Sequence, residues 1–171
     1  MIKITDNILS DHERTFIEQF LLGSTSWQFL WQEVNGKQEQ MMAIDVMRRN
    51  RVTNGVLSAP LELMLSRYMG SEFPDNKYHL HKINVNGQYS QHKTAWHTDV
   101  DYDPTDYNLI YHVNTNWNSA VDGGEYMTRD QTVDFVPGRF VLTRCDVEHI
   151  GTSPRSDKFR MSIAWTFKIY D

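Results

Sequence analysis

Two histidines and one aspartate stand out in this sequence by their type and spacing. His97 and Asp99 belong to the stretch Trp96-His97-Thr98-Asp99, and His149 follows much later in the chain. In an extended strand, residues i and i+2 point to the same face, so His97 and Asp99 present an imidazole and a carboxylate side by side. A second imidazole from a distant strand completes two histidines and one carboxylate on one side of a metal ion. That set leaves the other coordination positions open and is typical of a non-heme Fe(II) site that activates oxygen.

Arg160 supplies a cation for the same site. It follows His149 by about ten residues and begins a predicted strand in which Ser162, two residues later, shares its face. A buried guanidinium needs a partner, because an unpaired charge away from water is costly. A carboxylate can satisfy it through two parallel hydrogen bonds. We therefore predict that Arg160 holds the carboxylate of a metal-chelating cosubstrate; an internal ion pair with an aspartate or glutamate is the alternative.

Composition and charge narrow the class of protein. The 171 residues predict one domain, with an apolar fraction of 40% and a charged fraction of 23% that are ordinary for a globular protein. The net charge of −5 argues against a general basic surface for nucleic acid, and the basic run from Arg48 to Arg51 is interpreted as a solvated loop. The single cysteine, Cys145, favours a reducing compartment and is predicted to be buried. No signal peptide or membrane span is evident, so we expect a soluble cytoplasmic protein.

The first third of the chain predicts two helices. The first runs from a capping box at Ser10 to Gly23. The second is capped by Ser58, has Pro60 in its first turn and ends at Gly70. Its predicted core-facing residues are Leu61, Leu65, Tyr68 and Met69.

The segment between these helices is harder to interpret. A strand is predicted over Trp27–Trp31, with its three aromatic side chains in the core, and the polar stretch Gln32–Asn54 is read as loops around a strand that form part of a lid.

After Tyr78, short β-type runs alternate with turn residues, and this pattern is typical of a sandwich or barrel. Eight strands are predicted: 79–86, 95–100, 107–114, 125–128, 132–136, 139–144, 147–150 and 159–169. We therefore expect a mainly β fold with flanking helices and a single domain over 1–171. Residues 1–77 would form a helical buttress with lid elements, and 78–170 the β core.

The order of these features resembles a known family. His-x-Asp ends one strand, Asp122-Gly-Gly-Glu125 opens a later one, Pro137-Gly leads toward His149, and Arg160 begins the last strand. This order is similar to the 2-oxoglutarate- and Fe(II)-dependent dioxygenases, in particular the prolyl-4-hydroxylase-like group, whose core is a double-stranded β-helix or jelly roll. The resemblance covers about residues 78 to 168.

The resemblance implies roles for particular residues. His97, Asp99 and His149 would bind Fe(II), and Arg160, with help from the Ser162 hydroxyl, would hold the far carboxylate of 2-oxoglutarate. Relatives often place a tyrosine before a Gly-Gln pair to contact the cosubstrate. Here Asn84 stands at that place in Asn84-Val-Asn-Gly-Gln88, and Tyr89 or Tyr111 is an alternative contact.

The resemblance also implies a reaction. With O2 as the second cosubstrate, the enzyme would convert 2-oxoglutarate to succinate and CO2 and hydroxylate a prime substrate. That substrate would be a prolyl or other protein residue, or a small metabolite, bound by loops at 32–54, 88–95 and 101–106. Two other classes remain open, namely a cupin-like metal enzyme that needs no cosubstrate and a metal-binding module without catalysis.

Overall fold

The computed structural model describes residues 2–34, 36–99 and 103–170. Within these residues the chain forms eleven strands and three helices. Their bounds are β1 Lys3–Thr5, α1 Asp11–Leu22, β2 Gln28–Val34, β3 Lys37–Arg48, β4 Arg51–Val52, α2 Gly55–Glu72, β5 Lys77–Gln88, β6 Tyr107–His112, α3 Ser119–Asp122, β7 Tyr126–Thr128, β8 Thr132–Val133, β9 Phe140–Arg144, β10 His149–Gly151 and β11 Arg160–Tyr170.

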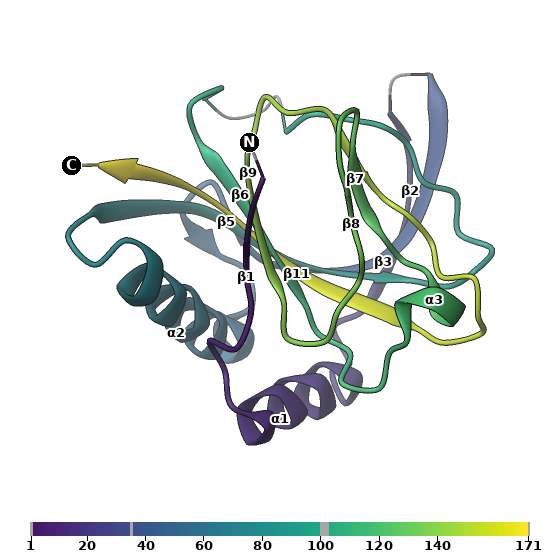
Figure 1. The fold of residues 1–171 in the computed structure, drawn as a ribbon, viewed down its shortest axis with the longest axis horizontal. Coiled ribbons are helices and arrows are strands. Elements are labelled where there is room, and N and C mark those ends of the chain that lie inside the picture. Colours follow the sequence, from purple (N-terminus) through teal and green to yellow (C-terminus); the bar gives the residue numbers. More distant parts are fainter. Residues whose placement is uncertain (1, 35, 100–102, 171) are drawn as a thin grey trace.

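The strands form two antiparallel sheets. The large sheet has the order β1-β9-β6-β11-β5-β3-β2, with β4 attached to β3, and the small sheet has the order β10-β7-β8. The long strands β3, β5 and β11 cross the centre of the molecule, and the small sheet lies over one face of the large one (Figure 1). This arrangement confirms the predicted mainly β fold with flanking helices.

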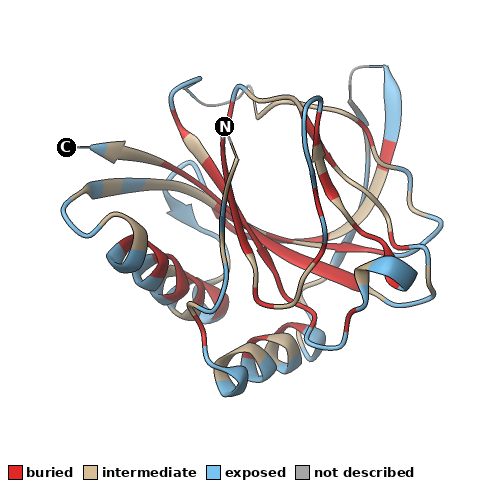
Figure 2. Cartoon of the chain, viewed as in Figure 1, coloured by how far each residue is buried: buried red, intermediate tan, exposed pale blue. Residues whose placement is uncertain are grey.

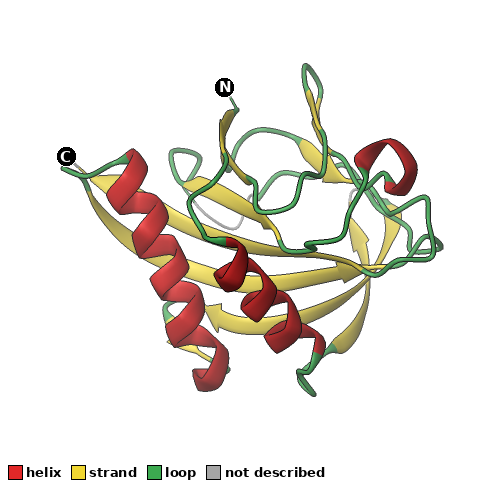
Figure 3. Ribbon diagram, turned by 60° about the horizontal axis from the view of Figure 1, so that its bottom comes forward, coloured by secondary structure: helices red, strands yellow, loops and turns green. Residues whose placement is uncertain are grey.

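The helices α1 and α2 cover the opposite face of the large sheet (Figures 1 and 3). Alternation along β11 explains why: Met161, Ile163, Trp165 and Phe167 are fully buried in the cluster that contains the α2 residues. The Trp165 indole also donates to the Leu61 carbonyl of α2 over 3.0 Å. The intervening β11 residues point to the other face, toward the small sheet. Figure 2 shows the buried positions gathered between the helices and the central strands.

The two long helices are close to the sequence prediction. Ser10 caps α1 in a complete capping box with Glu13, as expected. The second helix begins earlier than predicted because Asn54, and not Ser58, accepts from a first-turn backbone N–H. It also continues past Gly70 to Glu72, while the four predicted core residues are all buried.

Three predictions for strands and loops are wrong in detail. The stretch after Trp31 is not mainly loop: β2 and β3 pair as a long hairpin, and β3 also pairs with β5. Because β2 is the edge strand, Phe29 and Trp31 are 56% and 65% exposed, and only Trp27 packs on the core. The described part of 95–100 forms no strand and makes a single bridge, between His97 and His149.

Among the described residues, no helix has the length and apolar character needed to cross a membrane.

Candidate active site

The structure brings His97, Asp99 and His149 together. One potential ligand atom of each residue lies within 4.8 Å of those of the other two. Nε2 of His149 lies 3.8 Å from Oδ2 of Asp99. Two imidazoles and a carboxylate on one side of a point match the donor set of a facial non-heme iron site with open positions. The three residues fit a metal ion of this kind.

Both imidazoles are oriented by the backbone. Nδ1 of His97 lies 3.0 Å from the Ala95 carbonyl, and Nδ1 of His149 lies 2.9 Å from the Val147 carbonyl. A carbonyl only accepts, so each Nδ1 carries the proton and each Nε2 is left with a free lone pair. Such outer contacts fix the tautomer and ring orientation of metal-binding histidines.

Backbone hydrogen bonds hold the segment of His97 and Asp99 against the start of β10. His97 and His149 exchange two N–H to carbonyl bonds, of 2.9 and 2.8 Å, and the Asp99 N–H donates to the Cys145 carbonyl over 3.0 Å. The bridge between His97 and His149 therefore places His97 and Asp99 beside His149, which is the role expected of the predicted strand. The Cys145 side chain itself is buried, as predicted, and burial raises the pKa of its thiol.

Two contacts of this cluster were missed by sequence reasoning. The Asn108 side-chain amide on β6 donates to Oδ2 of Asp99 over 2.7 Å. The Tyr126 ring on β7 lies 5.3 Å from the His149 ring, and its hydroxyl lies 3.1 Å from the Thr143 hydroxyl. Burial lowers the pKa of His149, while Asp99 acts in the opposite direction.

Arg160 is buried beside this cluster. Its Nε donates to the Gly124 carbonyl over 3.0 Å, and Nη1 donates to Oε1 of Gln88 over 2.7 Å. No described carboxylate forms an ion pair with it, and the Glu125 carboxylate is bound by Arg155 and Thr152. Burial, only partly opposed by Glu125, lowers the pKa of Arg160 to about 10. Among the described residues, the alternative of an internal ion pair is therefore contradicted. The buried cation has neutral partners there, which favours an anionic ligand.

The Gly123-Gly124 turn makes room for this arginine. Both glycines have positive φ, of 69° and 81°, a region that residues with a Cβ rarely adopt. A Cβ on Gly124 would also lie 2.9 Å from Cδ of Arg160. The backbone therefore bends at Gly123-Gly124, and the Gly124 carbonyl accepts a hydrogen bond from the guanidinium.

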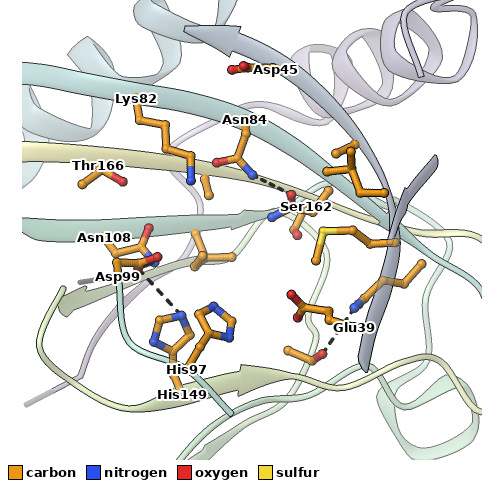
Figure 4. A pocket seen from close by; sticks show the side chains of 18 of the residues that line it. Glu39, Asp45, Lys82, Asn84, His97, Asp99, Asn108, His149, Ser162 and Thr166 are labelled. Carbon is orange, nitrogen blue, oxygen red and sulfur yellow. Dashed lines mark hydrogen bonds and ion pairs between the residues drawn. The ribbon is translucent and has the colours of Figure 1, made fainter. Parts of the chain in front are cut away.

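A pocket of about 540 Å³ lies between the two sheets, and its lining includes His97, Asp99, His149 and Arg160. Figure 4 shows His97, Asp99 and His149 on one side, with Asn84 and Ser162 on the strands that form its floor. The floor is polar because every second residue of β5, from Lys82 to Gln88, faces the pocket. This period of two could have been recognised in the sequence.

The other residues expected at the cosubstrate lie at different places. Ser162 is 3% exposed, lines the pocket and is two residues from Arg160 on β11. Asn84 also lines the pocket, and its amide donates to Asn86 over 2.5 Å. Tyr111 is in the core on the helix side of the sheet, and Tyr89 is 42% exposed, so neither alternative contact lines the pocket.

Of the three expected substrate loops, 32–54 contributes pocket residues from β3, whereas none of 88–95 beyond Gln88 lines the pocket. In the third, 101–106, residues 101 and 102 lie outside the described residues.

Comparisons with known proteins identify the fold. No protein-family model matches the sequence, and neither does any curated protein. A 2OG-Fe(II) oxygenase family oxidoreductase from Burkholderia pseudomallei matches with a TM-score of 0.73 and 15% identity, covering 98% of this chain and 84% of that one. A prolyl hydroxylase from Trichoplax adhaerens, in complex with a hypoxia inducible factor peptide, matches with a TM-score of 0.66 and 18% identity over 98% and 83% of the two chains.

A third solved structure in this group has a different activity in its name. The non-heme alpha ketoglutarate dependent epimerase SnoN from nogalamycin biosynthesis matches with a TM-score of 0.66 and 12% identity, over 98% of this chain and 78% of that one. The chain therefore has the double-stranded β-helix fold of these oxygenases. At identities this low, structural similarity establishes the fold alone, and the function has to be argued from the site.

Proposed function

We propose that the chain is an Fe(II)- and 2-oxoglutarate-dependent oxygenase that hydroxylates a prolyl or other peptide residue, or a small molecule, with release of succinate and CO2. His97, Asp99 and His149 would hold the iron, and Arg160 with Ser162 would hold the far carboxylate of 2-oxoglutarate. The observation that carries the proposal is Arg160. This arginine is buried, has no acidic partner among the described residues, and lines the same pocket as the two histidines and the aspartate.

Each residue has a defined part in this proposal. When bound, iron and 2-oxoglutarate together would supply the oxidative decarboxylation and the hydroxylating oxidant. The protein orients both imidazoles through backbone carbonyls and fixes the Asp99 carboxylate through Asn108. Gln88 and the Gly124 carbonyl hold the Arg160 guanidinium in place to receive a carboxylate. The contact of Asn84 with the cosubstrate stays a prediction. On the β5–β11 ladder Gln88 pairs with Arg160 and Asn86 pairs with Ser162, so Asn84 lies farther along the ladder from Arg160 than either of them.

The competing classes differ in what they require. A cupin-like enzyme or a metal-binding module needs no dicarboxylate, and neither explains a buried arginine that no described acid neutralises. The presence of Asp99 in the cluster favours hydroxylation over halogenation, since halogenating relatives lack this carboxylate.

The test is an anaerobic Fe(II) titration with and without 2-oxoglutarate, followed by a search for Fe(II)- and 2-oxoglutarate-dependent succinate formation in air. We expect a weak visible charge-transfer band that needs both components. Asp99→Ala should lose the band, while Asp134→Ala, an exposed acid on a different loop, should keep it. Iron binding without such a band would favour the cupin-like reading, and full turnover in Asp99→Ala would remove Asp99 from the ligand set.

A further inference from the structure

A second cationic region lies in the same pocket, far from Arg160. Across the large sheet, Arg48 pairs with Lys82, Lys82 with Thr166, and Thr166 with Asn108. These four residues, all of which line the pocket, are called the Lys82 row. Arg160 lies six residues before Thr166 on β11, which corresponds to about 20 Å along a strand.

The candidate metal site lies between these two regions. On one side, Gly151 follows His149 by two residues and its Cα faces the Arg160 guanidinium, since a Cβ there would lie 3.4 Å from both terminal nitrogens. On the other side, Asn108 of the Lys82 row binds Asp99. If Arg160 binds one anion, the Lys82 row is left for a different ligand on the opposite side of the metal.

Lys82 is available to bind such a ligand. Its side chain is half-buried and extends from β5 into the pocket, on the side where Thr166, Asn108 and Asp99 lie (Figure 4). Within the described ranges, neither the Lys82 ammonium nor the Arg48 guanidinium has an ion-pair partner. Lys82 lies in a concave site and is partly away from water, where a cation attracts a negatively charged group, whereas Arg48 is exposed.

The Thr166 hydroxyl adds a donor next to Lys82. Thr166 is only 3% exposed and lines the pocket, and its hydroxyl has no hydrogen-bond partner among the residues that the structure describes. A hydroxyl at the bottom of a pocket gains by donating to a ligand oxygen.

The acids of the pocket do not cancel this charge. Asp99 belongs to the metal cluster, and Glu39 is close enough to His149 to act on its pKa. Among the described residues that line the pocket, Asp45 is the remaining acid, and it is exposed. Leu30, Met41, Ile110 and Ala164 add apolar surface to a pocket whose floor is polar, so the space accepts a ligand with a partly apolar body and one anionic end.

We propose that the prime substrate is a small molecule with a carboxylate or phosphate group, and that Lys82, with Arg48 and the Thr166 hydroxyl, binds this group. The proposal rests on the proposed function, because it assigns Arg160 to 2-oxoglutarate and leaves the Lys82 row to the prime substrate. Charge-assisted hydrogen bonds from Lys82 would hold the anionic end while the apolar body lies toward the metal. A neutral internal peptide residue would leave Lys82 without a partner.

The test uses probes in pairs that differ only in the anionic group: N-acetyl-leucine against its amide, and glucose 6-phosphate against glucose. Binding to the Mn(II)- and 2-oxoglutarate-loaded protein is measured by calorimetry, and stimulation of succinate formation is measured with the Fe(II) enzyme in air. We expect the anionic member of at least one pair to bind and its neutral partner to bind at least tenfold more weakly. Which pair responds distinguishes a carboxylate from a phosphate.

Variants locate the binding. Lys82→Met should weaken binding of the anionic probe at least tenfold, and Lys82→Arg should retain most of it. Lys77→Met, at the exposed start of the same strand, should change nothing. The charge-transfer band with Fe(II) and 2-oxoglutarate should survive in Lys82→Met, which shows that the metal and cosubstrate sites are intact.

Two kinds of failure are distinguishable. Absence of the band in the unmodified protein contradicts the proposed function. A normal band, together with anionic probes that bind no better than their neutral partners or bind equally well to Lys82→Met, overturns this inference alone. Stimulation by a neutral proline-containing peptide that is unaffected by Lys82→Met would assign the pocket to a peptide.

Discussion

The side-chain amide of Asn108 donates a hydrogen bond to Oδ2 of Asp99 over 2.7 Å, from a strand that carries none of the three candidate ligands. This bond fixes one carboxylate oxygen and the rotation of the carboxylate plane. Partners of this kind typically contribute about 10–100-fold to metal affinity. Asn108→Ala should therefore weaken Fe(II) binding by about that factor in an anaerobic titration. Asn116→Ala, exposed on a nearby loop, is the control, and equal affinities in the two variants would show that Asn108 does not support the site.

The buried Arg160 predicts a selective loss of cosubstrate binding. Arg160→Met keeps the bulk of the side chain but removes the charge and its bonds to Gln88 and Gly124. Truncating one partner of a buried charged pair costs about 2–5 kcal/mol, so 2-oxoglutarate affinity should fall at least about 30-fold. Fe(II) affinity without 2-oxoglutarate should change little. Arg67→Met on the outer face of α2 is the control. A variant that loses iron and 2-oxoglutarate together would point to a structural role for Arg160.

His112 predicts acid sensitivity. It is fully buried against Phe135, and Nδ1 accepts from the Val136 N–H, so the ring is neutral. Burial, with a contribution from the Arg160 charge, lowers the pKa of His112 well below its usual value. In the unfolded chain this histidine takes up a proton below about pH 6.5, whereas in the folded protein it does not. Unfolding therefore becomes more favourable as the pH falls through that value, by up to about 1.4 kcal/mol per pH unit.

The measurement is the free energy of unfolding in urea between about pH 7.5 and about pH 5.5. His112→Phe should be less stable at the upper pH, because the Val136 N–H loses its acceptor, but its stability should fall less steeply with acid. His12→Phe, at an exposed position of α1, should keep the steep dependence. Parallel curves for all three proteins would mean that His112 does not titrate differently in the folded state.

The sequence carried enough information to bring His97, Asp99 and His149 together, because the i, i+2 spacing and the order of turns restrict where these residues can meet. It also predicted the core face of α2. The core face of α2 follows from a local periodicity, whereas the grouping of His149 with His97 and Asp99 follows from the order of motifs along the chain. The roles in metal and cosubstrate binding stay predictions that the titrations above address.

What sequence reasoning missed depends on strand order. Trp31 looks like a core residue, but β2 is at the edge of the sheet, so its ring is exposed. Asn108 lies in a mostly apolar strand, and no sequence motif around it indicates a function. It reaches Asp99 only because β6 pairs with both β9 and β11. Such contacts between distant strands are set by the whole topology.

Packing of α2 against the large sheet gives a prediction about stability. Leu61 is fully buried, and its carbonyl accepts from the Trp165 indole, whereas Leu63 on the same helix is 62% exposed. Removing a buried leucine side chain costs about 2–5 kcal/mol, the spread reflecting how far the cavity collapses. Leu61→Ala should therefore lower the free energy of unfolding by that amount in urea titrations, and Leu63→Ala by less than about 0.5 kcal/mol. The two variants have the same helix propensity, so their difference isolates burial from any effect on the helix itself. A similar decrease in the free energy of unfolding in both variants would mean that α2 does not pack on the sheet through Leu61, and would contradict the assignment of Leu61 to the core between the helices and the sheet.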